Sequence, residues 1–141
     1  MKAKLNFKGL TQNILIAACM LIISSCGQSS KEKESADFKL VIEKTNNGVK
    51  MQSIKGASWV NLSFSLNMEQ TQAVDEWGMT ELGKVSSDKD SNLADFLFTV
   101  KITDNRIVLK GIEGTAWSDL SFSLPENGKQ AFDQFGMTEL E

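Results

Sequence analysis

The chain lacks histidine and tyrosine altogether, and its two cysteines, Cys19 and Cys26, fall within the first 26 of 141 residues. The sequence after Cys26 therefore has no disulfide, no histidine base and no thiol nucleophile. These absences remove the Ser-His-Asp and Cys-His catalytic templates and histidine-based zinc sites. The sequence predicts a protein that is not an enzyme and that holds no cofactor and no metal.

Acidic residues are missing from the N-terminal segment, since no Asp or Glu precedes Glu32. From Cys26 onward the chain carries 12 Lys and Arg against 18 Asp and Glu, a net charge of −6. A body of that sign repels phosphate backbones and has no polybasic attraction to anionic lipid. We therefore expect no nucleic-acid partner, and any membrane attachment must come from the N-terminus.

The N-terminal segment has the anatomy of an export signal. Lys2, Lys4 and Lys8 precede an uninterrupted apolar run of ten residues at 14–23 (ILIAACMLII). Ten helical residues span about 15 Å, roughly half of a hydrocarbon core about 30 Å thick, so the run is too short for a permanent transmembrane helix. Residues 1–25 are predicted to be a signal peptide.

Ile23-Ser24-Ser25-Cys26 resembles the lipobox of bacterial lipoproteins, with an aliphatic residue and two small residues before an invariant cysteine. The resemblance implies cleavage between Ser25 and Cys26, a thioether-linked diacylglycerol on Cys26, and acylation of the new α-amine by a fatty acid such as palmitate. Two or three acyl chains hold a protein stably on a bilayer, whereas one binds only marginally. The expected partner of acylated Cys26 is therefore a lipid bilayer.

The residues after the cysteine bear on the choice of membrane. Gly27, in place of Asp, is similar to the sorting signal of outer-membrane lipoproteins, so the expected location is the outer membrane. The charged residues at 31–34 resemble export signals of surface lipoproteins of Bacteroidota, and they are equally typical of a solvated tether. The sequence leaves open whether the body faces the periplasm or the cell surface.

An internal repeat organises the remainder of the chain. Residues 38–82 align without a gap with residues 96–140, and about 19 of 45 positions are identical. We interpret this as a tandem duplication. The expected organisation is a lipidated tether (26–37), a first repeat (38–82), a linker (83–95) and a second repeat (96–141), with 38–141 forming one domain.

Alternating apolar residues predict strands in each repeat. A loop at Asn46-Asn47 pairs Ile42 with Met51 and Glu43 with Lys50, and a loop at Asp104-Asn105 pairs Ile102 with Ile107 and Val100 with Leu109. Both loops suit a type I′ turn, because Asn and Asp tolerate positive φ. After Gly56 and Gly114, where the chain can bend, a third strand alternates Leu, Phe and Ser.

The segments 72–82 and 130–140 fit either a short strand or one helical turn. The fold class expected is all-β and mainly antiparallel. Two pseudo-twofold related copies of a three- to four-stranded unit are expected to pack face to face into one sandwich- or barrel-like domain. The total is six to eight strands, and one short helical turn per copy is the alternative to a last strand. The repeat resembles short secreted proteins of Bacteroidota with a Gly-x-x-Trp-x-x-Leu-Ser-Phe-Ser-Leu core and a Gly-Met ending, a likeness that implies no activity.

Two carboxylates occupy equivalent positions in the repeats, Asp75 and Asp133. A twofold arrangement that brought them together would create the acidic pair of a carboxylate-based hydrolase. The alternative is that each Asp caps a turn by accepting backbone N–H groups. Asp88, Asp90 and Asp95 in the linker lack the loop glycine and terminal Glu of a calcium-binding EF-hand.

Aromatic and sulfur-containing side chains are the other candidates for binding, namely Trp59, Trp117, Met79 and Met137. The alternative for the tryptophans is core packing with the indole N–H satisfied locally. The serine faces of the third strands (Ser63 and Ser65, Ser121 and Ser123) offer either a sugar- or peptide-binding surface or a plain solvated sheet face.

The function that fits these features is a non-enzymatic, outer-membrane-anchored β-rich module that binds a protein, peptide or glycan. The alternative is an inhibitor or immunity-type lipoprotein, whose acidic body would suit a basic target. A carboxylate-based hydrolase is the least favoured of the three.

Overall fold

Ten strands make up almost all of the regular structure in this computed structural model, which describes residues 36–84 and 87–141. The predicted signal peptide, the lipobox with Ser25 and Cys26, and most of the tether lie outside the described residues. Within the described part, no helix has both the length and the apolar character needed to cross a membrane. The only helical segment described is one turn of 3-10 helix at Leu82–Lys84.

The strands form two antiparallel five-stranded sheets, which pack together as the expected all-β sandwich. The first sheet has the order β10-β9-β1-β2-β3 and the second the order β5-β4-β6-β7-β8. The first sheet contains β1 (Lys39–Lys44), β2 (Gly48–Lys55), β3 (Asn61–Ser65), β9 (Lys129–Asp133) and β10 (Gly136–Thr138). The second sheet contains β4 (Thr71–Asp75), β5 (Gly78–Thr80), β6 (Leu97–Thr103), β7 (Arg106–Glu113) and β8 (Asp119–Ser123).

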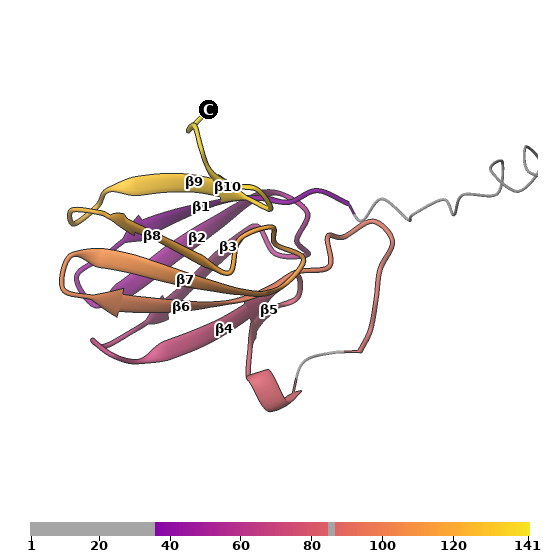
Figure 1. Cartoon of the computed structure of the whole chain (residues 1–141), viewed down its shortest axis with the longest axis horizontal. Coiled ribbons are helices and arrows are strands. Elements are labelled where there is room, and N and C mark those ends of the chain that lie inside the picture. The colour runs from indigo at the N-terminus through magenta and orange to yellow at the C-terminus, as the bar shows by residue number, and fades with distance from the viewer. Residues whose placement is uncertain (1–35, 85–86) are drawn as a thin grey trace, which may run out of the picture. The chain divides into compact units, whose positions relative to one another are not determined.

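The two halves of the chain exchange strands. Each sheet takes three strands from one half and two from the other, so that β9 of the second half pairs with β1 of the first, and β4 pairs with β6. Figure 1 shows the yellow β9 beside the indigo β1, although the two are far apart in the sequence. The repeats are therefore interlocked, which a face-to-face stacking of two complete units would not produce.

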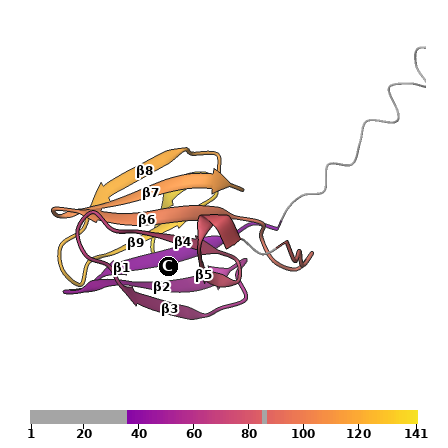
Figure 2. The same ribbon diagram turned by 90° about the horizontal axis from the view of Figure 1, so that it is seen from below.

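Figure 2 shows β1, β2 and β3 in one layer and β6, β7 and β8 in the other. The chain crosses between layers in short arches, 66–70 and 124–128. Each arch contains a residue with positive φ at the same repeat position, Glu69 and Asn127. Such short arches reach only the nearest strands of the opposite sheet, and this explains why the last two strands of each half join the other half's sheet.

The expected number of strands was too low. Each half contributes five strands instead of three to four, because the segments 72–82 and 130–140 each form a hairpin of two short strands, β4–β5 and β9–β10. Neither forms a helical turn, and the single 3-10 turn begins only at the end of the first repeat. Pairing of Asp75 with Gly78, and of Asp133 with Gly136, closes both hairpins tightly.

The predicted register of the two long hairpins is confirmed. Matching apolar residues on one face was enough to place both turns, because a slip of one residue would send the inner side chains outward. The observed pairs are Ile42 with Met51, Glu43 with Lys50, Ile102 with Ile107, and Val100 with Leu109.

The predicted type I′ geometry of these turns is wrong. A type I′ turn needs positive φ at both central residues. Among the described residues other than glycine, positive φ occurs at Glu69, Asp104 and Asn127. The first turn therefore has no central residue with positive φ, and the second has only Asp104. Cross-strand packing fixes the register here, and the turn adapts to it.

Phenylalanine rings fill the centre of the sandwich. Phe38 and Phe96 are equivalent residues, and their ring centroids lie 4.6 Å apart. Phe98 of β6 packs edge-on against Phe132 of β9, with centroids 5.5 Å apart. All four rings are fully buried. The core therefore joins residues from both halves, and neither half encloses it alone.

Candidate functional site

The two candidate tryptophans bridge the sheets. Trp59 lies before β3, and its Nε1–H donates to the carbonyl oxygen of Asp75 at 3.1 Å. Trp117 donates in the same way to Asp133 at 2.9 Å. Both rings are half-buried against the core cluster. Their indole donors are occupied by structural bonds, as the packing alternative predicted.

The candidate carboxylates cap their own turns. Asp75 Oδ1 accepts hydrogen bonds from the backbone N–H groups of Trp77 and Gly78, at 2.8 and 3.0 Å. Asp133 Oδ1 accepts the equivalent two bonds, at 2.7 and 3.1 Å. The two residues lie in different sheets. This arrangement favours the turn-capping alternative and lends no support to a shared acidic pair.

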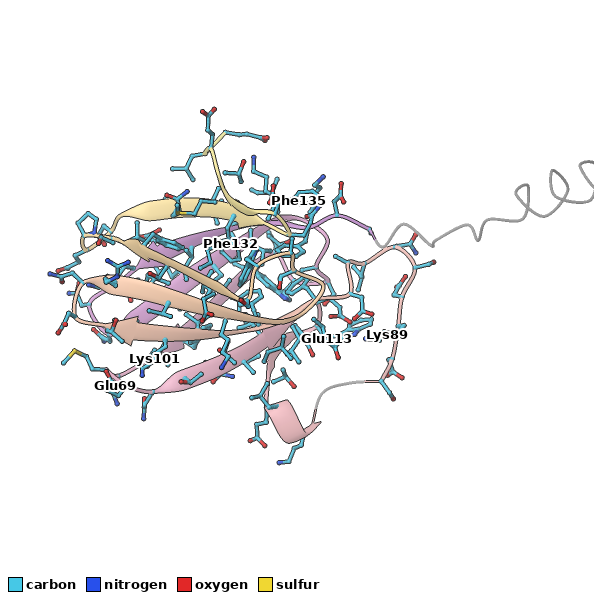
Figure 3. The ribbon with its side chains drawn as sticks, viewed as in Figure 1. Glu69, Lys89, Lys101, Glu113, Phe132 and Phe135 are labelled. Atoms are coloured by element: carbon cyan, nitrogen blue, oxygen red, sulfur yellow. The ribbon has the colours of Figure 1, made fainter. Side chains whose placement is uncertain are left out.

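The candidate methionines lie on the short edge strands. Met79 in β5 and Met137 in β10 are about half exposed. Beside Met137, Phe135 is 78% exposed, whereas its counterpart Trp77 is 42% exposed because its Nε1–H donates to the carbonyl oxygen of Asp88 in the linker. We call Phe135, Met137 and Leu140 the apolar patch. Figure 3 shows Phe132 within the sandwich and Phe135 beyond the end of that strand.

The linker packs against the end of the first half. Ala94 N–H donates to the carbonyl oxygen of Gly56 at 2.8 Å, and Lys89 Nζ pairs with Asp95 Oδ1 at 2.5 Å. One of the three linker carboxylates compared with a calcium site, Asp95, is therefore paired with an ammonium group. The described part of the chain holds no group of three or more His, Cys, Asp or Glu side chains placed to bind a metal ion.

The two halves differ at one pair of equivalent positions at this end, Glu76 in the first and Gln134 in the second. Gln134 donates from Nε2 to Asp37 Oδ1 at 2.7 Å, and its Oε1 accepts from the N–H of Phe38. The counterpart of Gln134 is Glu76, which is 4% exposed. Burial raises the pKa of Glu76, and the negative charges of Asp75 and Asp95 add to the rise, while a hydrogen bond from its own backbone N–H and the charge of Lys89 oppose it.

A concave surface lies at the opposite end of the sandwich from the linker, beside the turn of β1–β2. The turn of β6–β7 lies at the same end (Figure 1). This hollow encloses about 460 Å³ and opens to solvent. The arch at Asn127 closes one side, since Asn127 N–H donates to the carbonyl oxygen of Lys44 at 2.8 Å. Its lining residues are Thr45, Asn46, Asn47, Val49, Lys50, Ser63, Phe64, Ser65 and Asn127.

Gly48 fixes the close approach of β2 and β3 beside the hollow. Gly48 pairs with Ser65, and a Cβ atom at position 48 would collide with the backbone carbonyl oxygen of Phe64. Only glycine therefore allows β3 to lie this near, which brings Ser63 and Ser65 together with the turn residues.

The counterpart of Gly48 in the second half is Arg106. Its Nη2 donates to Ser121 Oγ at 2.6 Å, so a guanidinium group binds the serine equivalent to Ser63, although both serines are exposed. In the first half no side chain extends from position 48, and Ser63 lines the hollow. The serine hydroxyl is thus bound by the chain itself in the second half, whereas glycine stands at the position of that arginine in the first half.

Charge also differs between these equivalent surfaces. Asp104 and Glu69 beside the second sheet correspond in the repeat to Asn46 and Asn127 beside the first sheet, so two carboxylates are replaced by amides at the hollow. Glu69 pairs with Lys101 at 2.6 Å, and Figure 3 shows the two side chains near each other. The lining of the hollow therefore contains no carboxylate, and its one charge is that of Lys50.

A row of polar side chains leads from the hollow across the outer face of the first sheet. Lys129, Glu43, Lys50 and Ser63 are successive cross-strand neighbours in β9, β1, β2 and β3. Glu43 pairs with Lys129 at 3.6 Å, and no described carboxylate forms an ion pair with Lys50. A second depression of about 180 Å³ shares Lys50 with the hollow and includes Lys129.

The lining offers both hydrogen-bond donors and hydrogen-bond acceptors. Amide and hydroxyl groups each donate and accept, and the ammonium group of Lys50 adds a charged donor. A volume of about 460 Å³ lies within the range of about 300 to 1,000 Å³ that is usual for ligand sites. The hollow is thus suited to holding a polar ligand.

Sequence reasoning had singled out Ser63 and Ser65, but not the other residues of the hollow. The signal that would have found them is the comparison of the repeats at positions that differ, above all Gly48 with Arg106 and Lys50 with Val108. Identical positions mark the shared fold, whereas these differences mark the surface at which the halves diverge. Comparison of the chain with protein-family models, with curated proteins and with solved structures finds no match.

Proposed function

We propose that this protein is a lipid-anchored, non-catalytic binding module of the bacterial outer membrane, and that its ligand, a peptide or glycan, occupies the hollow. The observation that carries the proposal is the contrast between the halves. In the second half Arg106 binds the hydroxyl of Ser121, whereas in the first half glycine stands at the equivalent position and Ser63 lines a ligand-sized hollow. The polar lining supports a binding role.

The position of the hollow suits a tethered protein. The chain enters the sandwich at Phe38, and β1 then runs to Lys44 at the other end. Six extended residues cover about 20 Å. A tether attached before Phe38 therefore leaves the hollow at the far end of the body, accessible to a ligand.

The anchor is tested by mass spectrometry of the native protein. We expect a mature chain that begins at acylated Cys26 and fractionates with the outer membrane. Cys26→Ser should leave the protein unprocessed and unacylated. An unmodified thiol at position 26 in the wild type would refute the anchor. Proteinase treatment of intact cells would then decide whether the body faces the periplasm or the medium.

The binding role is tested by filling the hollow. Ser63→Trp places a large side chain at its lining, and Ser121→Trp makes the same change at the equivalent surface of the second half. We expect immobilised protein to retain a peptide or glycan component of envelope extracts, Ser63→Trp to lose it, and Ser121→Trp to keep it. Equal retention by all three proteins would contradict the proposed site.

A second candidate, an inhibitor or immunity-type lipoprotein, is favoured by the apolar patch. Phe135, Met137 and Leu140 are each more than half exposed. An apolar surface of this kind is common where one protein docks on another. Phe135→Glu should abolish inhibition of a secreted enzyme if this candidate is right, and it should leave ligand retention unchanged if the hollow is the functional surface.

A further inference from the structure

We propose that the ligand of the hollow is an acidic glycan, a chain of sugars bearing carboxylates. This inference rests on the proposed function and names its ligand class. Its basis is the chemistry of the lining and the way in which that lining departs from its counterpart in the second half.

The neutral part of the lining matches sugar hydroxyls. Three asparagines and three hydroxyl residues line the hollow, and each side chain both donates and accepts hydrogen bonds. A sugar hydroxyl has the same dual character. These residues are Thr45, Asn46, Asn47, Ser63, Ser65 and Asn127.

The charge of the lining selects an anion. The mature chain is acidic, with 12 basic and 18 acidic residues from Cys26 onward, yet the hollow holds Lys50 and no carboxylate. Two positions that carry carboxylates beside the second sheet, Asp104 and Glu69, are amides here. Within the hollow a ligand carboxylate thus meets the ammonium group of Lys50 and no carboxylate of the lining, while Glu43, the cross-strand neighbour of Lys50, is paired with Lys129. A charge-assisted hydrogen bond is about twice as strong as a neutral one.

The shape favours a chain over a single small molecule. The hollow opens to solvent, and the depression that shares Lys50 continues the concave surface towards Lys129. Glu43, which also lines this depression, lies between Lys50 and Lys129 on neighbouring strands and pairs with Lys129 at 3.6 Å. One acidic sugar would thus meet Lys50, and the next sugar of the chain would lie over the depression.

The experiment uses the detergent-solubilised full-length protein and tetrasaccharides of galacturonic, glucuronic and mannuronic acid, each also as its methyl ester. The ester keeps the hydroxyl groups and removes the negative charge. By titration calorimetry we expect at least one acid form to bind about tenfold more tightly than its ester, as one charge-assisted contact provides.

Two variants assign this preference to the hollow. Lys50→Gln should lower the affinity for the acid form to that for the ester, and Ser63→Trp should abolish the binding of both. Ser121→Trp is the matched control and should bind like the wild type. Thermal unfolding of each variant checks that the sandwich is intact.

The outcomes separate this inference from the proposed function. Equal affinity for acid and ester, or no binding of any tetrasaccharide, overturns the acidic-glycan inference. If envelope extracts still yield a ligand that Ser63→Trp loses, the proposed function survives and the ligand class is different. If Ser63→Trp changes neither measurement, both fall.

Discussion

Trp117 and Asp133 join the two sheets, since the indole Nε1–H before β8 donates to the backbone carbonyl oxygen in β9 at 2.9 Å. Trp59 and Asp75 make the equivalent bond from the first half. Both bonds lie at the end of the strands away from the arches 66–70 and 124–128, so they link the sheets where no arch connects them. The tryptophans therefore hold together an arrangement that depends on strand exchange.

The first prediction concerns this pair of bridges. Trp117→Phe removes one hydrogen bond and should lower the free energy of unfolding by about 1 kcal/mol. Trp117→Ala also removes packing against the core and should cost about 3 kcal/mol. Trp77→Phe is the control, because the second half has Phe135 there, and it should change stability by about 0.5 kcal/mol or less. Urea unfolding followed by tryptophan fluorescence measures all three.

The second prediction concerns the separate halves. Residues 36–84 alone contain β1 to β5, but β4 and β5 pair with the sheet of the other half. As a monomer this fragment would leave its core face uncovered, so we expect it to form a symmetric homodimer in which β4–β5 exchange between two copies. Light scattering with circular dichroism tests this, and a folded monomer would contradict the interlocked arrangement.

The third prediction concerns Gly48. Gly48→Ala introduces a Cβ that collides with the carbonyl oxygen of Phe64, so β3 must move away from β2. We expect a loss of about 2 kcal/mol, typical of overpacking. Gly83→Ala is the matched control, because a Cβ at that position would meet nothing within 4 Å. If both variants unfold at the same temperature as the wild type, the close approach of β2 and β3 is not as described.

The fourth prediction concerns the buried carboxylate. Burial raises the pKa of Glu76 above its ordinary value of 4.5. The folded state therefore binds more protons than the unfolded state between the two pKa values, and the free energy of unfolding falls as pH rises through that window. Glu76→Gln should be more stable than the wild type at pH 7 by about 1 kcal/mol, since the amide can form the bonds that Gln134 makes.

This advantage should shrink as the pH falls to about 4.5, where the protonated wild-type side chain has lost its penalty. The reciprocal change, Gln134→Glu, places a carboxylate beside Asp37 and should destabilise the protein at pH 7. Thermal unfolding from about pH 4 to about pH 8, a range that includes the ordinary value of 4.5, measures both. A pH-independent difference would contradict the assignment to Glu76.

The sequence indicated the fold closely where the pattern depends on residues that are close in the chain or directly paired in one hairpin. Alternation of apolar residues located the first three strands of each half, and matching of inner faces fixed the register of Ile42 with Met51 and of Ile102 with Ile107. The turn-capping alternative for Asp75 and Asp133 also followed from residue type alone. Each of these features is set by neighbours along the chain or directly across one hairpin.

The candidate site was harder to predict from the sequence. Ser63 and Ser65 were visible as a polar face, but Asn127 joins them only because the arch of the second half packs beside the first hairpin. The last strands of each repeat were also ambiguous, because three-residue strands carry too few residues to show a period.

By itself, the sequence determined three features, since these depend on residue identity and spacing. They are the absence of histidine and of thiols after Cys26, the internal repeat, and the pattern of strands. Only the tertiary structure decided that the halves exchange strands and that Ser63 lies in a hollow. The physical reason is that a short arch reaches only the nearest strand of the facing sheet, which brings Asn127 to the first half's hairpin. Whether the chain itself binds the serine hydroxyl then depends on a single position, which is Arg106 in one half and Gly48 in the other.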